Sequence, residues 1–157
     1  MRLLGVASTG ILFGLSIAAD LLSAPGDSTP VFSLVSTTAP PPPIPLTPND
    51  RGYVRVEINS GSTGCSINTE LVACQTSANN WPVNATGQHF HTASVNTAGE
   101  FHWVDADLGA LEGRITLNNQ TYTAQGWTIV VAQGGTTFTN GGSGHGMSVS
   151  DQGVKPF

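Results

Sequence analysis

The chain has 157 residues, of which 10% are charged, and its formal net charge at pH 7 is -5. This length leaves room for one folded domain beside a leader and a linker, and it excludes a second. The 5 Lys and Arg residues are dispersed along the chain, at positions 2, 51, 55, 114 and 155. Because nucleic-acid binding needs a clustered basic face, we predict no nucleic-acid partner.

Residues 1–24 are typical of a signal peptide or a membrane anchor. Arg2 supplies the positive start, and residues 3–19 form an uncharged run rich in Leu, Ile, Ala and Gly. Asp20 interrupts this run before it reaches the roughly 20 apolar residues that span a bilayer. We expect cleavage of the leader, and the alternative is a retained hydrophobic helix that associates with a membrane through residues 3–19. Both alternatives predict an extracytoplasmic protein that is secreted or associated with the cell envelope.

Residues 25–50 are predicted to form a flexible, proline-rich linker. Proline fixes φ and removes the backbone donor, so the run at residues 40–48 favours extended polyproline II. At about 3.1 Å per residue, this run spans about 28 Å and can act as a spacer. The folded domain is therefore expected to occupy residues 51–157.

The domain carries the signals of many short strands. Val54, Val56 and Ile58 alternate with polar residues, as in a half-buried strand. Asn118-Asn119 is suited to a two-residue hairpin turn, and residues 97–99 to a three-residue loop with glycine last. We predict an all-β fold, a small single-domain antiparallel β-sandwich or a partly closed barrel. Further strands are expected at residues 64–67, 72–75, 88–95, 100–106, 114–117, 120–124, 127–132, 136–139 and 147–150.

The two cysteines of the chain are predicted to form a disulfide. A hairpin with residues 68–71 as its loop sets Cys65 opposite Cys74, which permits the bond. Export places the chain in an oxidising compartment, so a structural disulfide is favoured over a metal-binding or catalytic thiol pair.

A candidate metal site centres on His89 and His91, which project from the same face if they lie on one strand. A three-residue loop at residues 97–99 pairs Val95 with Phe101 and sets the two histidines opposite Asp105 and Asp107. A four-residue loop instead places His89, His91 and His102 on a common face. Both registers allow a Zn²⁺ or Cu²⁺ site. The alternative is a set of partly exposed polar residues on a solvent-facing side of the sheet.

The glycine-rich segment at residues 140–146 favours a conformationally demanding turn. A phosphate loop is disfavoured because a strand, and not a helix, is predicted to follow. Ser143 could act as a nucleophile with His91 or His102 and Asp105, but the segment lacks the nucleophile-elbow pattern. His145 is expected to be a hydrogen-bonding loop residue and a candidate ligand contact.

Aromatic side chains offer a second candidate binding surface. Trp81 lies in the sequence Asn-Asn-Trp-Pro, which is typical of an exposed loop. We therefore predict Trp81 as a ligand contact, whereas the other aromatic residues are expected to pack in the core.

Two segments carry a resemblance to a known family. Residues 60–65, SGSTGC, followed by residues 72–74, VAC, and residues 144–150, GHGMSVS, followed by Phe157, resemble the pattern SGNIxC, VxC, GHGFxVS and an aromatic end. That pattern belongs to small secreted or lipid-anchored proteins of mycobacteria and related actinobacteria. This chain lacks the second cysteine pair and the lipobox found in members of that family. The resemblance implies an envelope location and a compact β fold, and it implies no reaction.

Taken together, the sequence predicts an exported cell-envelope module without catalytic activity. It is expected to bind an envelope protein or a wall component, or to serve as an accessory subunit of a membrane or wall assembly. One alternative is a metal-binding or redox-protective protein that uses His89 and His91. A second alternative is a small hydrolase.

Overall fold

The structure is a computed structural model that describes residues 39–157. The predicted leader and most of the predicted linker lie outside the described residues. Within the described range, no helix is long and apolar enough to cross a membrane. The elements are β1 (Ile44–Pro45), β2 (Val54–Ile58), the short 3-10 helix η1 (Asn59–Gly61), β3 (Thr63–Ile67), β4 (Leu71–Thr76), β5 (Thr92–Asn96), β6 (Phe101–Val104), β7 (Ile115–Thr116), β8 (Thr121–Ala124), β9 (Trp127–Ala132), β10 (Gly135–Asn140), β11 (Gly146–Ser150) and β12 (Gly153–Pro156).

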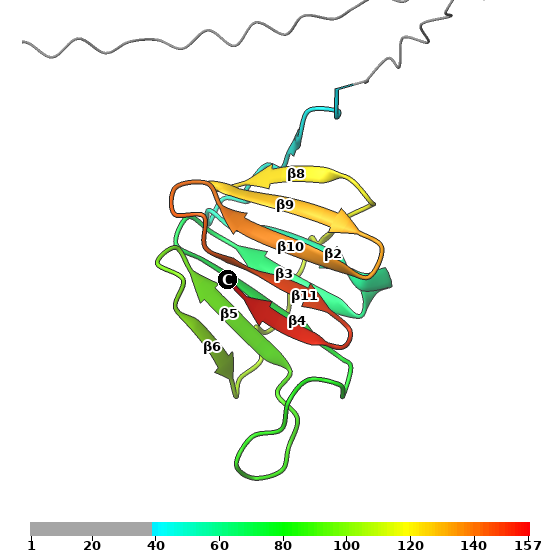
Figure 1. Ribbon diagram of the computed structural model, residues 1–157, viewed down its shortest axis with the longest axis vertical. Coiled ribbons are helices and arrows are strands. Elements are labelled where there is room, and N and C mark those ends of the chain that lie inside the picture. The colour runs from blue at the N-terminus through cyan, green and yellow to red at the C-terminus, as the bar shows by residue number, and fades with distance from the viewer. Residues whose placement is uncertain (1–38) are drawn as a thin grey trace, which may run out of the picture. The chain divides into compact units, whose positions relative to one another are not determined.

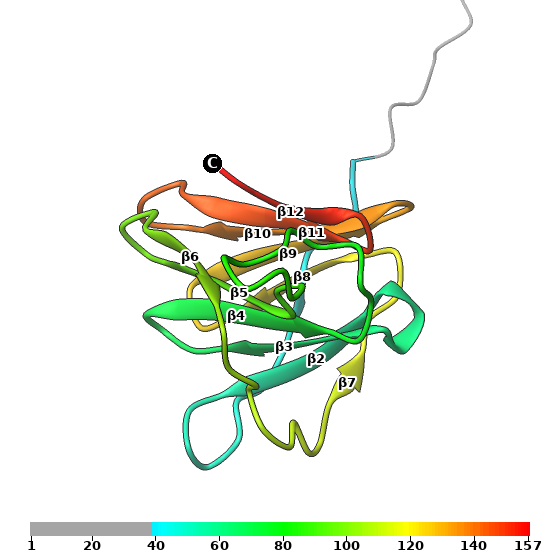
Figure 2. The same ribbon diagram turned by 90° about the horizontal axis from the view of Figure 1, so that it is seen from below.

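These strands form two sheets that pack face to face (Figure 2). Sheet A has the order β1-β8-β9-β10-β11-β12, and sheet B has the order β6-β5-β4-β3-β2-β7. Neighbouring strands are antiparallel except at two edges, where β1 runs parallel to β8 and β7 runs parallel to β2. The prediction of an all-β sandwich is confirmed, and the alternative of a partly closed barrel is not found.

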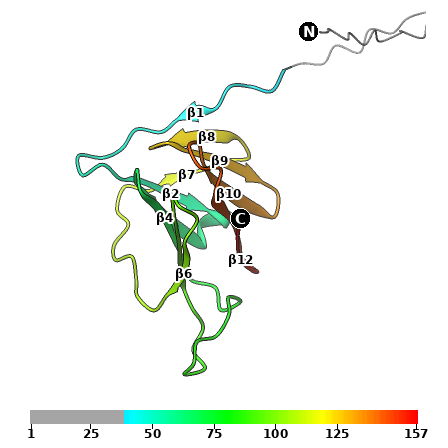
Figure 3. The same cartoon turned by 60° about the vertical axis from the view of Figure 1, so that its left-hand side comes forward.

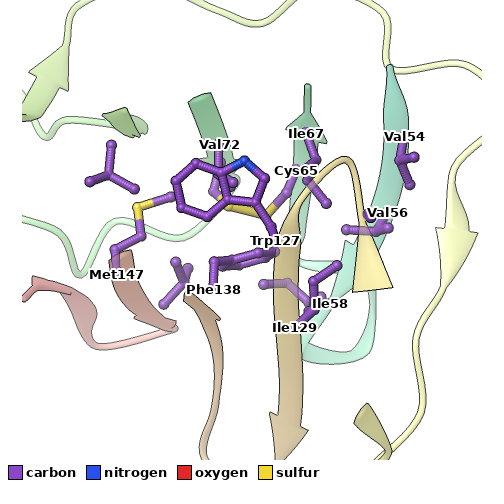
Figure 4. Close-up of a cluster of buried hydrophobic side chains, with 14 of the residues drawn as sticks. Val54, Val56, Ile58, Cys65, Ile67, Val72, Trp127, Ile129, Phe138 and Met147 are labelled. Carbon is purple, nitrogen blue, oxygen red and sulfur yellow. A yellow bond between two sulfur atoms is a disulfide. The ribbon is translucent and has the colours of Figure 1, made fainter. Parts of the chain in front are cut away.

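The core lies between the two sheets, where alternate residues of each strand point inward. In β2 the apolar residues Val54, Val56 and Ile58 are buried, while Arg55 and Glu57 point to the outer face of sheet B. Figure 4 shows side chains of both sheets gathered around Trp127. The Trp127 Nε1 donates a 3.0 Å hydrogen bond to the Asn68 carbonyl, so the indole polar atom is satisfied inside the core.

The predicted disulfide is confirmed. β3 and β4 form a hairpin in which Ile67 pairs with Val72 and Cys65 pairs with Cys74. Cys65 and Cys74 are bonded to each other, and both are fully buried on the core face of sheet B. The bond therefore joins two neighbouring central strands.

The folded domain begins earlier than the predicted boundary at Arg51. Ile44 and Pro45 pair with Tyr122 and Thr123 of β8, and Figure 3 shows β1 alongside β8. Leu46 packs partly buried against the core, and its amide donates a 2.8 Å hydrogen bond to the Thr123 carbonyl. An edge strand tolerates proline because one side of the strand has no partner. The carboxyl part of the predicted spacer is therefore part of sheet A.

The predicted hairpin at Asn118-Asn119 is wrong. β7 pairs with β2 in sheet B, whereas β8 pairs with β9 in sheet A, so the chain changes sheets here. The Tyr122 hydroxyl accepts a 3.0 Å hydrogen bond from the Asn118 amide and holds this turn. Local turn chemistry therefore marks a reversal between sheets and not within one.

The connection from β6 to β7 must pass from one edge of sheet B to the other, because these strands lie at opposite ends of the strand order. Residues 105–114 make this passage and are called the crossing loop below. Figure 2 shows the crossing loop on the side of sheet B that faces away from sheet A. Figure 1 views the sandwich through its faces, with the strands of sheet A in front of those of sheet B.

Candidate functional site

The structure selects one of the two registers considered for the histidines. Val95 pairs with Phe101, so the predicted three-residue loop at residues 97–99 is confirmed. His102 pairs with Ser94 and is exposed. The register that places His102 on a common face with His89 and His91 is therefore wrong. β5 begins at Thr92, so both other histidines precede the strand on which they were expected.

His89, His91, Asp105 and Asp107 line one pocket of about 230 Å³, as the confirmed register predicts. Within residues 39–157, however, no group of three or more His, Cys, Asp or Glu residues is arranged to hold a metal ion. His89 Nδ1 lies 2.5 Å from the Trp81 carbonyl oxygen, which engages one of its two nitrogens. A Zn²⁺ or Cu²⁺ site at this pocket stays an untested alternative, and the interpretation of these residues as partly exposed polar groups is favoured.

The two carboxylates of this pocket are already hydrogen-bonded to amide side chains. Asp105 accepts a 3.0 Å bond from Asn84, and Asp107 accepts a 2.9 Å bond from Gln75. These bonds connect the start of the crossing loop to β4 and to the loop that precedes β5. The pocket residues therefore have a structural role in fixing the path of the loop.

The prediction that Trp81 is an exposed ligand contact is wrong. The exposed fraction of its side chain is 0%, and its Nε1 donates a 3.1 Å hydrogen bond to the Ser150 carbonyl. Its ring centroid lies 5.5 Å from that of Trp103 in an edge-to-face arrangement. Trp81 therefore joins the loop that precedes β5 to the end of β11, and it is a core residue.

The glycine-rich segment forms the turn between β10 and β11, and Gly144 has a φ of 77°. His145 is exposed, and a Cβ built at Gly99 would lie 2.7 Å from its Cγ, so the imidazole packs on the Gly99 backbone. The Ser143 hydroxyl donates a 3.3 Å hydrogen bond to Asn140 Oδ1. No imidazole nitrogen among the described residues bonds to Ser143 Oγ, so the structure does not supply the base that a serine nucleophile needs.

The candidate site that sequence reasoning missed is a groove beneath the crossing loop. Its floor is the outer face of sheet B, where Arg55 pairs with Ser66 and Ser66 pairs with Ala73. The side chains of Ser66 and Ala73 are small, so space remains between the sheet and the crossing loop. The groove has a volume of about 370 Å³. This volume falls within the range of about 300–1,000 Å³ that is typical of small-molecule sites.

Apolar side chains from three separate segments line this groove, which we call the crossing-loop groove. Tyr53 precedes β2, Leu71 begins β4, and Leu108 and Leu111 belong to the crossing loop. Tyr53 is 37% exposed, so its ring is accessible from solvent. The full lining consists of Arg51, Tyr53, Arg55, Ser66, Asn68, Leu71, Ala73, Leu108 and Leu111.

The crossing loop is held over the groove by contacts that flank it. The Leu108 amide donates a 2.7 Å hydrogen bond to Gln75 Oε1 on the outer face of β4. Farther along the loop, the side chain of Leu111 lies against Gly64 of β3, where a Cβ would approach it to 2.9 Å. The salt bridge between Arg114 and Glu57, with a separation of 3.5 Å, follows at the end of the loop. The loop is therefore fixed on both sides of the space that it covers.

The alternation of β2 already contained one signal of this groove. Arg55 occupies a position that must point away from the core, opposite small outward residues of the neighbouring strands. The crossing loop itself could not be placed from sequence, because its path depends on the strand order.

Comparison with known proteins does not assign this chain to a family: no family model, curated protein or solved structure matches it.

Proposed function

We propose that the chain is an exported, non-catalytic binding module of the cell envelope, and that the crossing-loop groove is its ligand site. The observation that carries the proposal is the groove of about 370 Å³ between the crossing loop and the outer face of sheet B. Its lining combines apolar side chains with polar ones, and small-molecule sites use apolar walls for contact and polar groups for orientation.

Export is supported by the disulfide in the core and by the leader-like sequence of residues 1–24. A buried disulfide is typical of proteins that fold in an oxidising compartment. The resemblance to small envelope proteins of actinobacteria agrees with this location. Mass spectrometry of the mature protein tests it, since cleavage after Ala18 or Ala19 is the expected result and an intact, reduced cytosolic chain would contradict it.

Ligand binding in the groove is tested with Nile red, a neutral apolar dye, added to the purified full chain. We expect the fluorescence of the dye to rise when it binds to the parent chain. This rise should be absent in Ser66→Phe, because the added ring fills the floor of the groove. Ser94→Phe is the matched control, since Ser94 lies on the same outer face and pairs with Ala73 but does not line the groove.

The expected effect is a decrease in dye affinity of about tenfold or more in Ser66→Phe, with the control unchanged. Near-UV circular dichroism of both variants must match that of the parent, because partly unfolded states also bind apolar dyes. Equal dye binding by the two variants, or none by the parent, would refute the groove as a ligand site.

A further inference from the structure

Two arginines line the crossing-loop groove, and no acidic side chain lines it. Within the described range the basic residues are Arg51, Arg55, Arg114 and Lys155, and the one salt bridge joins Arg114 to Glu57. The positive charges of Arg51 and Arg55 are therefore not neutralised by a carboxylate in this part of the chain. They stand together in a protein whose formal net charge is -5.

The Arg55 guanidinium is only partly satisfied by the protein. Its Nε is buried and has no hydrogen-bond partner. Its Nη1 reaches the carbonyl oxygens of Ala110 at 3.5 Å and Glu112 at 3.3 Å, which are long contacts. A guanidinium carries five N–H donors. The residue as a whole is half-buried, so part of this group remains accessible. Arg55 therefore retains donors and charge for an anion in the groove.

Arg51 is held beside this position by a tight turn. The backbone amides of Arg51 and Tyr53 both donate 3.0 Å hydrogen bonds to Asn49 Oδ1. The Gly52 carbonyl accepts a 2.6 Å bond from Gln125 Nε2, which connects the turn to the segment between β8 and β9. The backbone that carries Arg51 and Tyr53 is thus fixed before a ligand arrives, which reduces the entropy lost on binding.

We propose that the ligand of the crossing-loop groove is an amphipathic anion, a carboxylate or a phosphate monoester attached to a hydrocarbon body. This proposal rests on the proposed function, because it names the ligand of the same groove. The anionic head accepts hydrogen bonds from Arg51 and Arg55, and guanidinium groups bind carboxylate and phosphate with two parallel bonds. The hydrocarbon body lies against Tyr53, Leu71 and the leucines of the crossing loop.

The proposal is tested by calorimetric titration of the full chain with three probes that share one hydrocarbon chain. Decanoate carries a carboxylate, decyl phosphate carries a phosphate, and decanol carries no charge. All three are used below the concentrations at which they form micelles. We expect either or both anions to bind about tenfold or more tightly than decanol, because charge-assisted hydrogen bonds to arginine are lost with the alcohol. The ratio between decanoate and decyl phosphate identifies which head group the site prefers.

Two variants measure separately how the charged head and the hydrocarbon body of the ligand contribute to its affinity. Arg55→Gln removes one of the two positive charges of the groove, so its affinity for the anions is expected to fall toward that for decanol, while decanol binding stays unchanged. Tyr53→Ala shortens the apolar wall, so it is expected to weaken anion and alcohol binding by the same factor. Lys155→Gln is the matched control, since it removes one positive charge on the other sheet, outside the groove.

Decanol binding equal to that of both anions in the parent chain would overturn the proposal, as would an equal effect of Arg55→Gln and Lys155→Gln. Binding of an acidic peptide without binding of either alkyl anion would also overturn it. In each of these cases Nile red can still bind in the groove of the parent chain, and this binding can still be lost in Ser66→Phe. Failure of the ligand class is thereby distinguished from failure of the groove as a site.

Discussion

Replacing Gly146 by alanine should destabilise the domain more than any other single methyl group added to the turn between β10 and β11. Gly146 begins β11 and pairs with Thr139 of β10. Its amide and carbonyl form two 3.0 Å hydrogen bonds with the carbonyl and amide of Phe157. A Cβ at this position would overlap the Phe138 carbonyl oxygen and lie 2.9 Å from the Phe138 carbonyl carbon.

The magnitude follows from what the new methyl group meets. Added atoms in a packed region cost about 1–3 kcal/mol, and the upper end applies here because the obstacle is the backbone of a central strand. We expect the free energy of unfolding to fall by about 3 kcal/mol in Gly146→Ala. Gly144→Ala meets no atom within 4 Å but keeps a φ of 77°, so it should cost about 1 kcal/mol. His145→Ala removes an exposed side chain and should cost less than about 0.5 kcal/mol.

Equilibrium unfolding in urea, followed by tryptophan fluorescence, measures all three differences. Trp81 and Trp127 are fully or almost fully buried, so their emission reports the loss of the core. The slopes of the three transitions must agree for the midpoints to be compared. A Gly146→Ala variant as stable as Gly144→Ala would refute the steric reasoning.

Three further predictions concern the disulfide, the buried indole and the histidine pocket. The double variant Cys65→Ala, Cys74→Ala should lose roughly 2–3 kcal/mol of stability in thermal unfolding, because its unfolded chain gains the freedom that the closed loop removes; an unchanged melting temperature would contradict this. Trp81→Phe loses the hydrogen bond to the Ser150 carbonyl and part of the indole volume, so its stability in urea should fall by about 2 kcal/mol while Nile red affinity stays unchanged. A decrease in dye affinity in that variant would place Trp81 back in the ligand site. Calorimetric titration with Zn²⁺ should give no heat at micromolar metal, because His89 Nδ1 is engaged with the Trp81 carbonyl and both aspartates are bonded to amides. Heat that disappears in His91→Ala would show a metal site instead.

Alternation along the chain was sufficient to find most strands. β9 occupies the predicted residues 127–132, and the β3–β4 hairpin has the predicted register. These predictions depend on neighbours within a few residues, where local periodicity and turn chemistry are decisive. β12 was missed because Gly153–Pro156 lacks a clear alternation and is held by pairing with β11.

The errors have a common physical cause, which is contact between segments that are far apart in the chain. Trp81 looked exposed from its polar neighbours, but its environment is set by Trp103 and Ser150. Asn118-Asn119 has the chemistry of a hairpin turn, yet the strands on either side belong to different sheets.

The crossing-loop groove was not predictable for the same reason. Its lining comes from residues 51–55, 66–73 and 108–111, and only the strand order brings these segments together. Arg55 was recognisable as an outward-facing residue of β2. Its position beneath the crossing loop, and the buried Nε without a hydrogen-bond partner, could be found only from the structure.

The short parallel strand β1 also covers part of one border of sheet A. Without it, β8 would offer a free row of backbone donors and acceptors at the border of sheet A, and such borders can recruit strands from other molecules. Pro45 and the prolines before Ile44 have no amide hydrogen to offer to an incoming chain. The proline-rich segment is thus expected to disfavour the addition of a further strand at this border, an effect that a plain spacer would not have.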